Sequence, residues 1–184
     1  MEEFSLYVLD ITMNSVRAGA DEIGVSLIED GETLTFSVTD NGCGMSEEQV
    51  KRLVDPFFTT RTTRAVGLGV PFLAMLAEQT GGGVEITSRS AAEYPDDHGT
   101  TLTATFGLHH IDMIPLGDMI DTVITLIQGN PEINFTYTHK KPNGEVRLSA
   151  AELREVLGDV SLGEFAVLEW IRGYLTEAYE ELRP

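Results

Sequence analysis

Residues 55–76, DPFFTTRTTRAVGLGVPFLAML, place hydroxyl and guanidinium side chains just before a Gly-Leu-Gly that opens an apolar helix pattern. The start of a helix carries unpaired N–H groups and about half a positive charge. Glycines let a phosphate approach that backbone closely, and hydroxyls and guanidiniums can complete the binding site. The same composition also suits an ordinary loop that leads into a helix. The segment is therefore a candidate phosphate site that needs support from the rest of the chain.

Two further groups of residues could act with such a site. Asp10 and Asn14 lie four residues apart, so both side chains project from one face of a helix. They could hold a hydrated magnesium ion or an attacking water, or they could simply lie on a solvated face. Asp40 ends an apolar strand pattern and precedes Gly42 and Gly44. Its carboxylate could accept a hydrogen bond from an exocyclic amine beside a flat ring, or the segment could be a common strand-to-loop turn.

A fourth element is the segment HGTTLTATF, in which Gly99 and Thr100 enter a predicted strand. A threonine hydroxyl near Asp40 could complete a site that recognises a base.

These residues need elements to position them, and the first is a helix. The apolar residues Leu6, Leu9, Met13 and Val16 recur at helical spacing, and Gly19 is a plausible stop. The next segments predict two strands joined by a hairpin turn at EDGE, and then a short helix. Ser46 and Gln49 are spaced as a capping box for that helix.

A third helix, VPFLAMLAEQT, is predicted to begin after Gly69 and to end at the glycines at 81–83, followed by the strands VEITSRS and TLTATFGL. Strands in sequence, with helices gathered between them, favour a mixed sheet with helices on one face. The predicted fold class is α+β, a two-layer sandwich, with a domain over residues 1–110.

Residues 111–184 predict a small α+β appendage docked on, or tethered to, that domain. They contain a helix pattern, the hairpin INFTYTH–EVRLS, and two further helices. Ser149 and Glu152 are spaced as a capping box for the first of these helices, and Ser161 and Glu164 for the second. This segment could contact a partner or a second copy, or it could simply add core helices.

Taken together, the motifs resemble those of the Bergerat-fold ATPases, a superfamily that includes histidine kinases, gyrase B, the large heat-shock chaperone and MutL. LDITMNSVRAGADEIGV resembles the N box, with NSVRAGA similar to the MutL version, and DNGCGM matches the D-x-G-x-G box. DPFFTTR resembles the histidine-kinase F box, and GLGV resembles the glycine box that follows it. The resemblance covers roughly residues 5–108, with the motifs in the family's order.

The resemblance implies ATP and Mg²⁺ as ligands. Asp40 would bind the adenine amino group, Thr100 would help through a water, and Gly42 and Gly44 would line the adenine pocket. Asn14 would coordinate the magnesium. The phosphates would be bound by backbone amides of Gly67, Leu68 and Gly69, with Arg61 and Arg64 as cationic candidates and Thr59 and Thr60 nearby.

Two departures from the family pattern bear on activity. The family usually has Glu where this chain has Asp10, whose side chain reaches about 1.5 Å less far. Hydrolysis could therefore be slow or could use a repositioned water, with Asp10 as the water-orienting base. Only nine residues precede Asp10, fewer than the dimerisation helices and phosphoacceptor histidine of a sensor kinase would require. The sequence thus predicts a stand-alone domain.

Composition limits the partners. The formal net charge of −18 argues against nucleic acid or an anionic membrane as the main partner. The single cysteine, Cys43, excludes an internal disulfide and a multi-cysteine zinc site. An acidic N-terminus without a signal-peptide pattern predicts a cytoplasmic protein.

The expected function is that of a Mg-dependent ATP-binding protein of the histidine-kinase type. It would act as a nucleotide-gated regulatory module or as a kinase on a separate, unidentified protein. The alternatives are an ATP-hydrolysing switch that opens and closes a homodimer, and a non-catalytic ATP sensor. Whether the chain is an enzyme is left open by the sequence.

Overall fold

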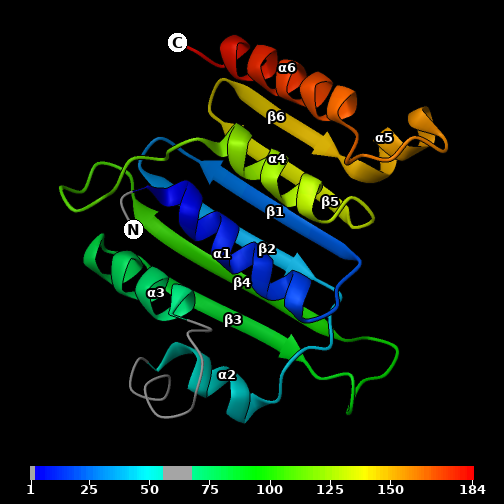
Figure 1. Ribbon diagram of the computed structural model, residues 1–184. Coiled ribbons are helices and arrows are strands. Elements are labelled where there is room, and N and C mark those ends of the chain that lie inside the picture. Colours follow the sequence, from blue (N-terminus) through cyan, green and yellow to red (C-terminus); the bar gives the residue numbers. More distant parts are fainter. Residues whose placement is uncertain (1–2, 56–67) are drawn as a thin grey trace.

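One mixed sheet of six strands organises the computed structural model, which describes residues 3–55 and 68–184 (Figure 1). The order across the sheet is β3-β4-β2-β1-β5-β6. The strands are β1 (Glu22–Glu29), β2 (Thr33–Asp40), β3 (Gly83–Arg89), β4 (Gly99–Gly107), β5 (Asn134–Lys141) and β6 (Gly144–Ser149). The helices are α1 (Phe4–Arg17), α2 (Glu47–Val54), α3 (Gly69–Gln79), α4 (Met119–Gly129), α5 (Ala150–Leu157) and α6 (Phe165–Glu181).

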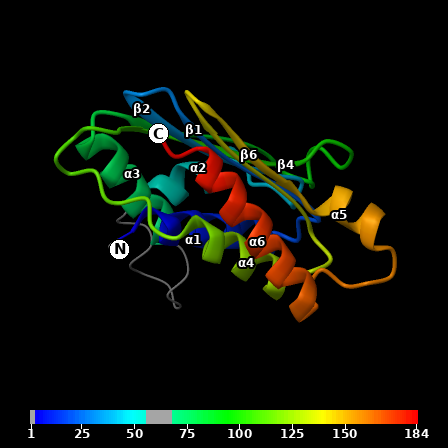
Figure 2. The same ribbon diagram turned by 90° about the horizontal axis from the view of Figure 1, so that it is seen from above.

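The helices gather on one face of the sheet, as Figure 2 shows, and the alternation of residues in the strands explains why. Side chains two residues apart in a strand lie on the same face. In β2 the buried residues are Leu34, Phe36 and Val38, and in β4 they are Leu102, Ala104 and Phe106. The predicted fold class, α+β with a mixed sheet and helices on one face, is confirmed.

Helix α1 lies at the centre of this helical layer because its first turn is anchored in the core. Phe4 is fully buried, and its ring meets Phe36 and Phe106 edge to face at centroid distances of 5.5 and 5.0 Å. Such aromatic pairs add to the stabilisation that burial alone provides. The anchor fixes the position of the helix that carries Asp10 and Asn14.

The helix predicted from the first apolar pattern is confirmed, but the residues of that pattern are not the ones that it buries most deeply. The residues that α1 buries include Tyr7, Val8 and Ile11, whereas Leu6 is 45% exposed. The remaining residues of the predicted stripe, Leu9, Met13 and Val16, are only partly buried. Several apolar stripes fit this sequence at helical spacing, and the position of the sheet decides which one is buried.

Residues 111–184 extend the same sheet. Strand β5 pairs in parallel with β1, from Glu22 opposite Asn134 to Ile28 opposite Lys140, and β6 pairs antiparallel with β5. Helix α4 packs on α1, and α6 packs on α4. Backbone hydrogen bonds of the sheet therefore join residues 1–110 to residues 111–184. The division of the chain into two domains at residue 110 remains a prediction.

Two of the three predicted capping boxes fall at helix starts. Ser46 and Gln49 form the reciprocal pair at α2, and Ser149 Oγ accepts from the Glu152 N–H at α5. The box at Ser161 and Glu164 is wrong, because α6 begins only at Phe165. Ser161 Oγ instead accepts from the Gly163 N–H, which forms a local turn.

Within the described residues, every helix is too short or too polar to cross a membrane.

Candidate nucleotide site

Asp40 lies at the end of β2, where the strand leaves the sheet. It continues the alternating series Leu34, Phe36 and Val38 of β2, so its side chain lies on the same, helix-covered face of the sheet. Asp40 Oδ2 accepts from Ser15 Oγ of α1 at 2.5 Å, and Oδ1 accepts from the Gly42 N–H at 2.9 Å. These two bonds orient the carboxylate, and each oxygen retains a lone pair that can accept another donor.

The glycine turn after Asp40 is packed so closely that side chains are excluded. A Cβ at Gly42 would lie 2.8 Å from Ala18 Cβ, at the end of α1. Gly44 has φ +64°, and a Cβ there would overlap the backbone carbonyl of Arg89. The Cys43 N–H donates to the Ala18 carbonyl at 2.9 Å, so the turn is attached to α1. Glycine is required because backbone atoms occupy the space of a side chain.

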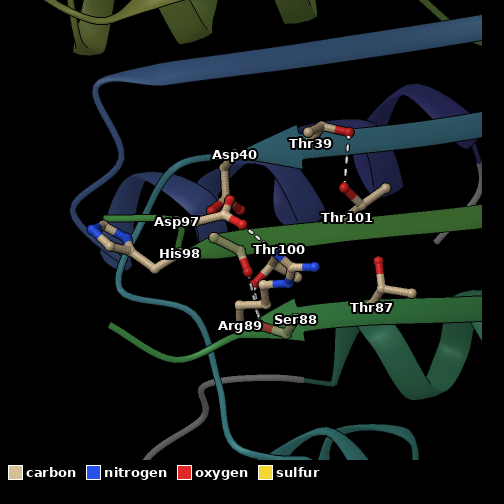
Figure 3. Close-up of a pocket in the computed structure, with 10 residues that line it drawn as sticks. Thr39, Asp40, Thr87, Ser88, Arg89, Asp97, His98, Thr100 and Thr101 are labelled. Atoms are coloured by element: carbon tan, nitrogen blue, oxygen red, sulfur yellow. Dashed lines mark hydrogen bonds and ion pairs between the residues drawn. The ribbon is translucent and has the colours of Figure 1, made fainter. Parts of the chain in front are cut away.

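Thr100 lies directly opposite Asp40, because the β2–β4 register pairs these two residues. Figure 3 shows Asp40, Thr100 and Ser88 at the neighbouring ends of β2, β4 and β3. The hydroxyls of Ser88 and Thr100 are 2.8 Å apart, and Ser88 Oγ also accepts from the Met45 N–H at 2.8 Å. The structure thus brings Thr100 next to Asp40, and Ser88 joins this pair to the glycine turn.

Asp10 and Asn14 both lie on α1, and each borders a different part of the site. Asn14 lines the same cavity as Asp40. Its Oδ1 accepts from Arg17 Nη1 at 2.9 Å. Asp10 does not line that cavity, but its carboxylate lies against Gly69 so closely that a Cβ on Gly69 would overlap it. Asp10 is therefore located at the start of α3.

The start of α3 completes the arrangement. Leu68 is the N-cap residue, Gly69 begins the helix, and the next residue, Val70, lines the cavity. Leu68 supplies no side-chain cap, which is consistent with backbone N–H groups that can serve a ligand. The other predicted phosphate-contact residues, Thr59, Thr60, Arg61, Arg64 and Gly67, lie outside the described residues.

A cavity of about 300 Å³ lies between these residues. Its polar edge holds Asp40, Asn14 and Thr100, and its walls are mostly apolar: Ile11, Val38, Met45, Leu53, Val70, Ile86 and Leu102. Apolar walls with a few fixed polar groups are typical of small-molecule sites. Such a cavity suits a flat ring that presents an amine to Asp40.

A second hollow, of about 430 Å³, lies at the same strand ends and is drawn in Figure 3. It shares Asp40 and Thr100 with the first, but hydroxyl groups and the Arg89–Asp97 ion pair line much of it. Among the described residues, large apolar side chains, Asn14 and the start of α3 are all missing from its lining, so we assign the ring site to the first cavity.

Sequence reasoning missed three polar residues of this site, namely Ser15, Arg17 and Ser88. Ser15 binds Asp40, and Ser88 binds Thr100. Arg17 is the only lysine or arginine among the described residues that line the cavity. Its position one helical turn after Asn14 was a usable signal. The two serines carry no such signal, because their partners lie far away in the sequence.

Magnesium fits the chemistry of this site only together with further oxygen ligands. Mg²⁺ prefers oxygen and is usually bound through one or two protein groups plus phosphates and water. Asn14 Oδ1 offers one such oxygen. Within residues 3–55 and 68–184, no group of three or more His, Cys, Asp or Glu side chains could hold a metal. Phosphate oxygens would therefore have to supply ligands beside Asn14.

Comparison with known proteins agrees with this geometry. Residues 3–110 match the family described as histidine kinase-, DNA gyrase B- and HSP90-like ATPases. The chain is 33% identical over 87 residues to the nitrogen regulation protein NtrY of Azorhizobium caulinodans, covering 47% of this chain and 10% of NtrY. It is 29% identical over 99 residues to sporulation kinase B of Bacillus subtilis, covering 52% of this chain and 22% of that kinase. The chain thus matches only a minor part of these relatives' length.

The fold also matches a solved structure beyond the family-matched residues. The MutL ATPase domain of Aquifex aeolicus, solved in complex with ADP, superposes with a TM-score of 0.56 at 16% identity. The match covers 85% of this chain and 68% of the MutL chain. The likeness therefore includes part of residues 111–184.

Proposed function

Because the chain belongs to the histidine kinase-, DNA gyrase B- and HSP90-like ATPase family, we propose that it binds Mg-ATP and acts as a nucleotide-gated regulatory module or protein kinase on a separate protein. One observation carries the proposal: the Asp40 carboxylate and the start of α3 border a single apolar cavity. In this proposal the partner is a protein, rather than nucleic acid or a membrane, and the setting is the cytoplasm. A homodimer is a further proposal.

Different residues would bind the adenine and the phosphates of the nucleotide. Asp40 accepts the adenine amino group, and Thr100 assists through a water. Gly44 lines the wall beside the ring, whereas Gly42, which was also predicted to line the pocket, packs against Ala18 and does not line the cavity. Amides at the start of α3 bind phosphate, because unpaired N–H groups and the helix dipole favour an anion there. The residues predicted to contact the phosphates are Thr59, Thr60, Arg61, Arg64, Gly67, Leu68 and Gly69.

Asn14 would hold the magnesium ion together with phosphate oxygens. The ion would neutralise phosphate charge, which matters in a chain whose formal net charge is −18. Arg17 would then leave Asn14 Oδ1 and add a second positive charge beside the phosphates.

Hydrolysis is the second candidate, and the position of Asp10 favours it. The Asp10 carboxylate lies at the start of α3, where the proposal puts the phosphates. A carboxylate there could orient a water or accept its proton. ATP hydrolysis would then change the conformation of the protein. A partner protein would respond to that conformation without receiving a phosphate.

The decisive experiment is incubation of the protein with γ-labelled Mg-ATP, alone and with a cell extract that supplies candidate partners, followed by separation of free phosphate from protein-bound label. Label on a partner protein supports the kinase, and free phosphate alone supports the ATPase. If neither appears but Mg-ATP raises the melting temperature, the protein is a sensor. If Mg-ATP has no effect on stability or labelling, the proposed function fails.

Replacing Asp10 with asparagine tests the hydrolytic role. If Asp10 orients the water, phosphate release should fall about 100-fold, because loss of general-base assistance has that size. ADP affinity, measured by calorimetry, should change by no more than about twofold. Asp159→Asn, in the exposed loop after α5, is the matched control. Unchanged phosphate release in Asp10→Asn would remove Asp10 from the mechanism.

Replacing Arg17 with glutamine tests the proposed contact between Arg17 and the phosphates. We expect ATP affinity to fall about tenfold, because one charge-assisted hydrogen bond to phosphate is lost. Arg147→Gln is the control, since this residue lies on the distant edge strand β6 and pairs with Glu152. Equal ATP affinities for both variants and the native protein would show that Arg17 does not reach the phosphates.

A further inference from the structure

A chain of largely buried polar side chains connects three elements in the half of the sheet away from the nucleotide site. His139 of β5 is fully buried. Its Nε2 lies 2.7 Å from Glu29 Oε1 of β1, and its Nδ1 lies 2.8 Å from the Tyr179 hydroxyl of α6. The Tyr179 hydroxyl lies 2.5 Å from that of Tyr137, on β5. The chain therefore links β1, in the family-matched part, to α6 near the C-terminus.

The Glu29 carboxylate fixes the direction of every hydrogen bond in this chain. A carboxylate can only accept, so His139 Nε2 carries the proton and Nδ1 is the acceptor. Tyr179 must then donate to Nδ1, and Tyr137 must donate to Tyr179. With neutral His139, every member has a partner. Among the described residues no buried side-chain polar atom lacks one.

Protonation of His139 reverses this order. Both ring nitrogens then donate, so the Tyr179 oxygen accepts from Nδ1 and the Tyr179 proton loses its acceptor. If that proton turns toward Tyr137, the Tyr137 proton loses its acceptor instead. Tyr137 is 3% exposed, and the described residues offer its hydroxyl no second partner. Leaving a buried hydroxyl without an acceptor is unfavourable.

We propose that the Glu29–His139–Tyr179–Tyr137 chain is a proton-operated latch that holds α6 on the sheet. The latch is closed while His139 is neutral and opens when His139 gains a proton. The proposal is independent of nucleotide binding. It would make the surface that α6 presents to a partner depend on pH.

The surroundings of His139 support the direction of this switch. Burial lowers the pKa of His139, against the opposing effect of the Glu29 carboxylate. Lys141 Nζ lies 3.8 Å from the same Glu29 oxygen and also lowers the pKa of His139. The paired residues on the neighbouring strands, Leu27 of β1 and Val146 of β6, are uncharged. Burial raises the pKa of Tyr179 to about 12, so Tyr179 keeps its proton throughout.

The pH window follows from the sign of the shift. A histidine whose pKa is lowered in the folded state binds its proton more readily when unfolded. Its contribution to stability is complete above its ordinary pKa of 6.5 and is lost as the pH falls through the lower folded-state value. The latch should thus open on acidification below about pH 6.5.

The test is hydrogen exchange of the full chain between about pH 5 and pH 8, corrected for the intrinsic exchange rate. Protection of α6 should fall about tenfold on acidification, the cost of one unsatisfied hydroxyl, while that of α3 stays constant. Trp170, the single tryptophan, lies on α6 and reports the same change by fluorescence.

Two variants separate the latch from general acid unfolding. His139→Gln cannot titrate, so its α6 protection should not depend on pH. Tyr179→Phe breaks the chain but keeps His139, so α6 should already be about tenfold less protected at neutral pH. The proposal is overturned if native α6 protection is constant with pH, or if His139→Gln loses it as the native protein does. If His139→Gln does not fold, full neutral-pH protection of α6 in Tyr179→Phe is enough to overturn it.

Discussion

Replacing Asp40 with asparagine is expected to weaken the binding of ATP and ADP about 100-fold, which corresponds to about 2.7 kcal/mol. The proposed site uses Asp40 as an acceptor for the adenine amino group. Asparagine has almost the same shape but presents an NH₂ group on one side, so a donor would face a donor. Calorimetry or the thermal shift produced by Mg-ADP measures the effect.

The matched control is Asp30→Asn, in the turn between β1 and β2. Asp30 also accepts backbone N–H groups, from Glu32 and Thr33, but it lies at the opposite end of β2 from Asp40. Both variants therefore perturb a similar local turn, and only Asp40→Asn should change nucleotide affinity. An Asp40→Asn protein that folds and binds ADP as tightly as the native chain would refute the proposed site.

Replacing Gly44 with alanine should lower the free energy of unfolding by about 3 kcal/mol and abolish nucleotide binding. Two effects combine at this position. The backbone has φ +64°, which disfavours any residue with a Cβ, and that Cβ would overlap the carbonyl group of Arg89. Because the obstacle is backbone, the turn itself would have to move away from the cavity that Gly44 lines. Chemical denaturation and ADP calorimetry measure the two losses.

Gly81→Ala separates the two effects. Gly81 has φ +84°, but a Cβ there would meet nothing within 4 Å. Backbone strain alone should cost about 1 kcal/mol, and nucleotide affinity should stay unchanged. Equal losses of stability in the two variants would show that the Gly44 turn tolerates displacement.

Local features of the fold were readable from the sequence because each depends on residues close together in the chain. The first helix, the β1–β2 hairpin and the caps at Ser46 and Ser149 follow from periodicity and turn chemistry. The cap predicted at Ser161 failed although its local pattern was equally good. Gly163 lies within the predicted first turn, and Ser161 forms a tight turn with it instead.

The site was only partly readable. The residue types and order of the motifs identified Asp40, Gly42, Gly44 and Thr100 as candidates, and the structure brings them together at adjoining strand ends. Ser15 and Ser88 could not be found in this way. Ser15 is 25 residues from Asp40, and only the packing of α1 on the sheet gives it a role. The same packing, and not local spacing, places Asp10 against Gly69.

By itself the sequence determined the family, the identity of the elements and the chemical groups of the candidate site, because these are properties of short stretches of chain. The tertiary structure alone decided which face of α1 is buried, that β5 pairs in parallel with β1, and that His139 meets Glu29 across 110 residues. Each of these depends on contacts between residues distant in the sequence. Such contacts form only when the whole sheet and its helices bury their apolar surfaces together.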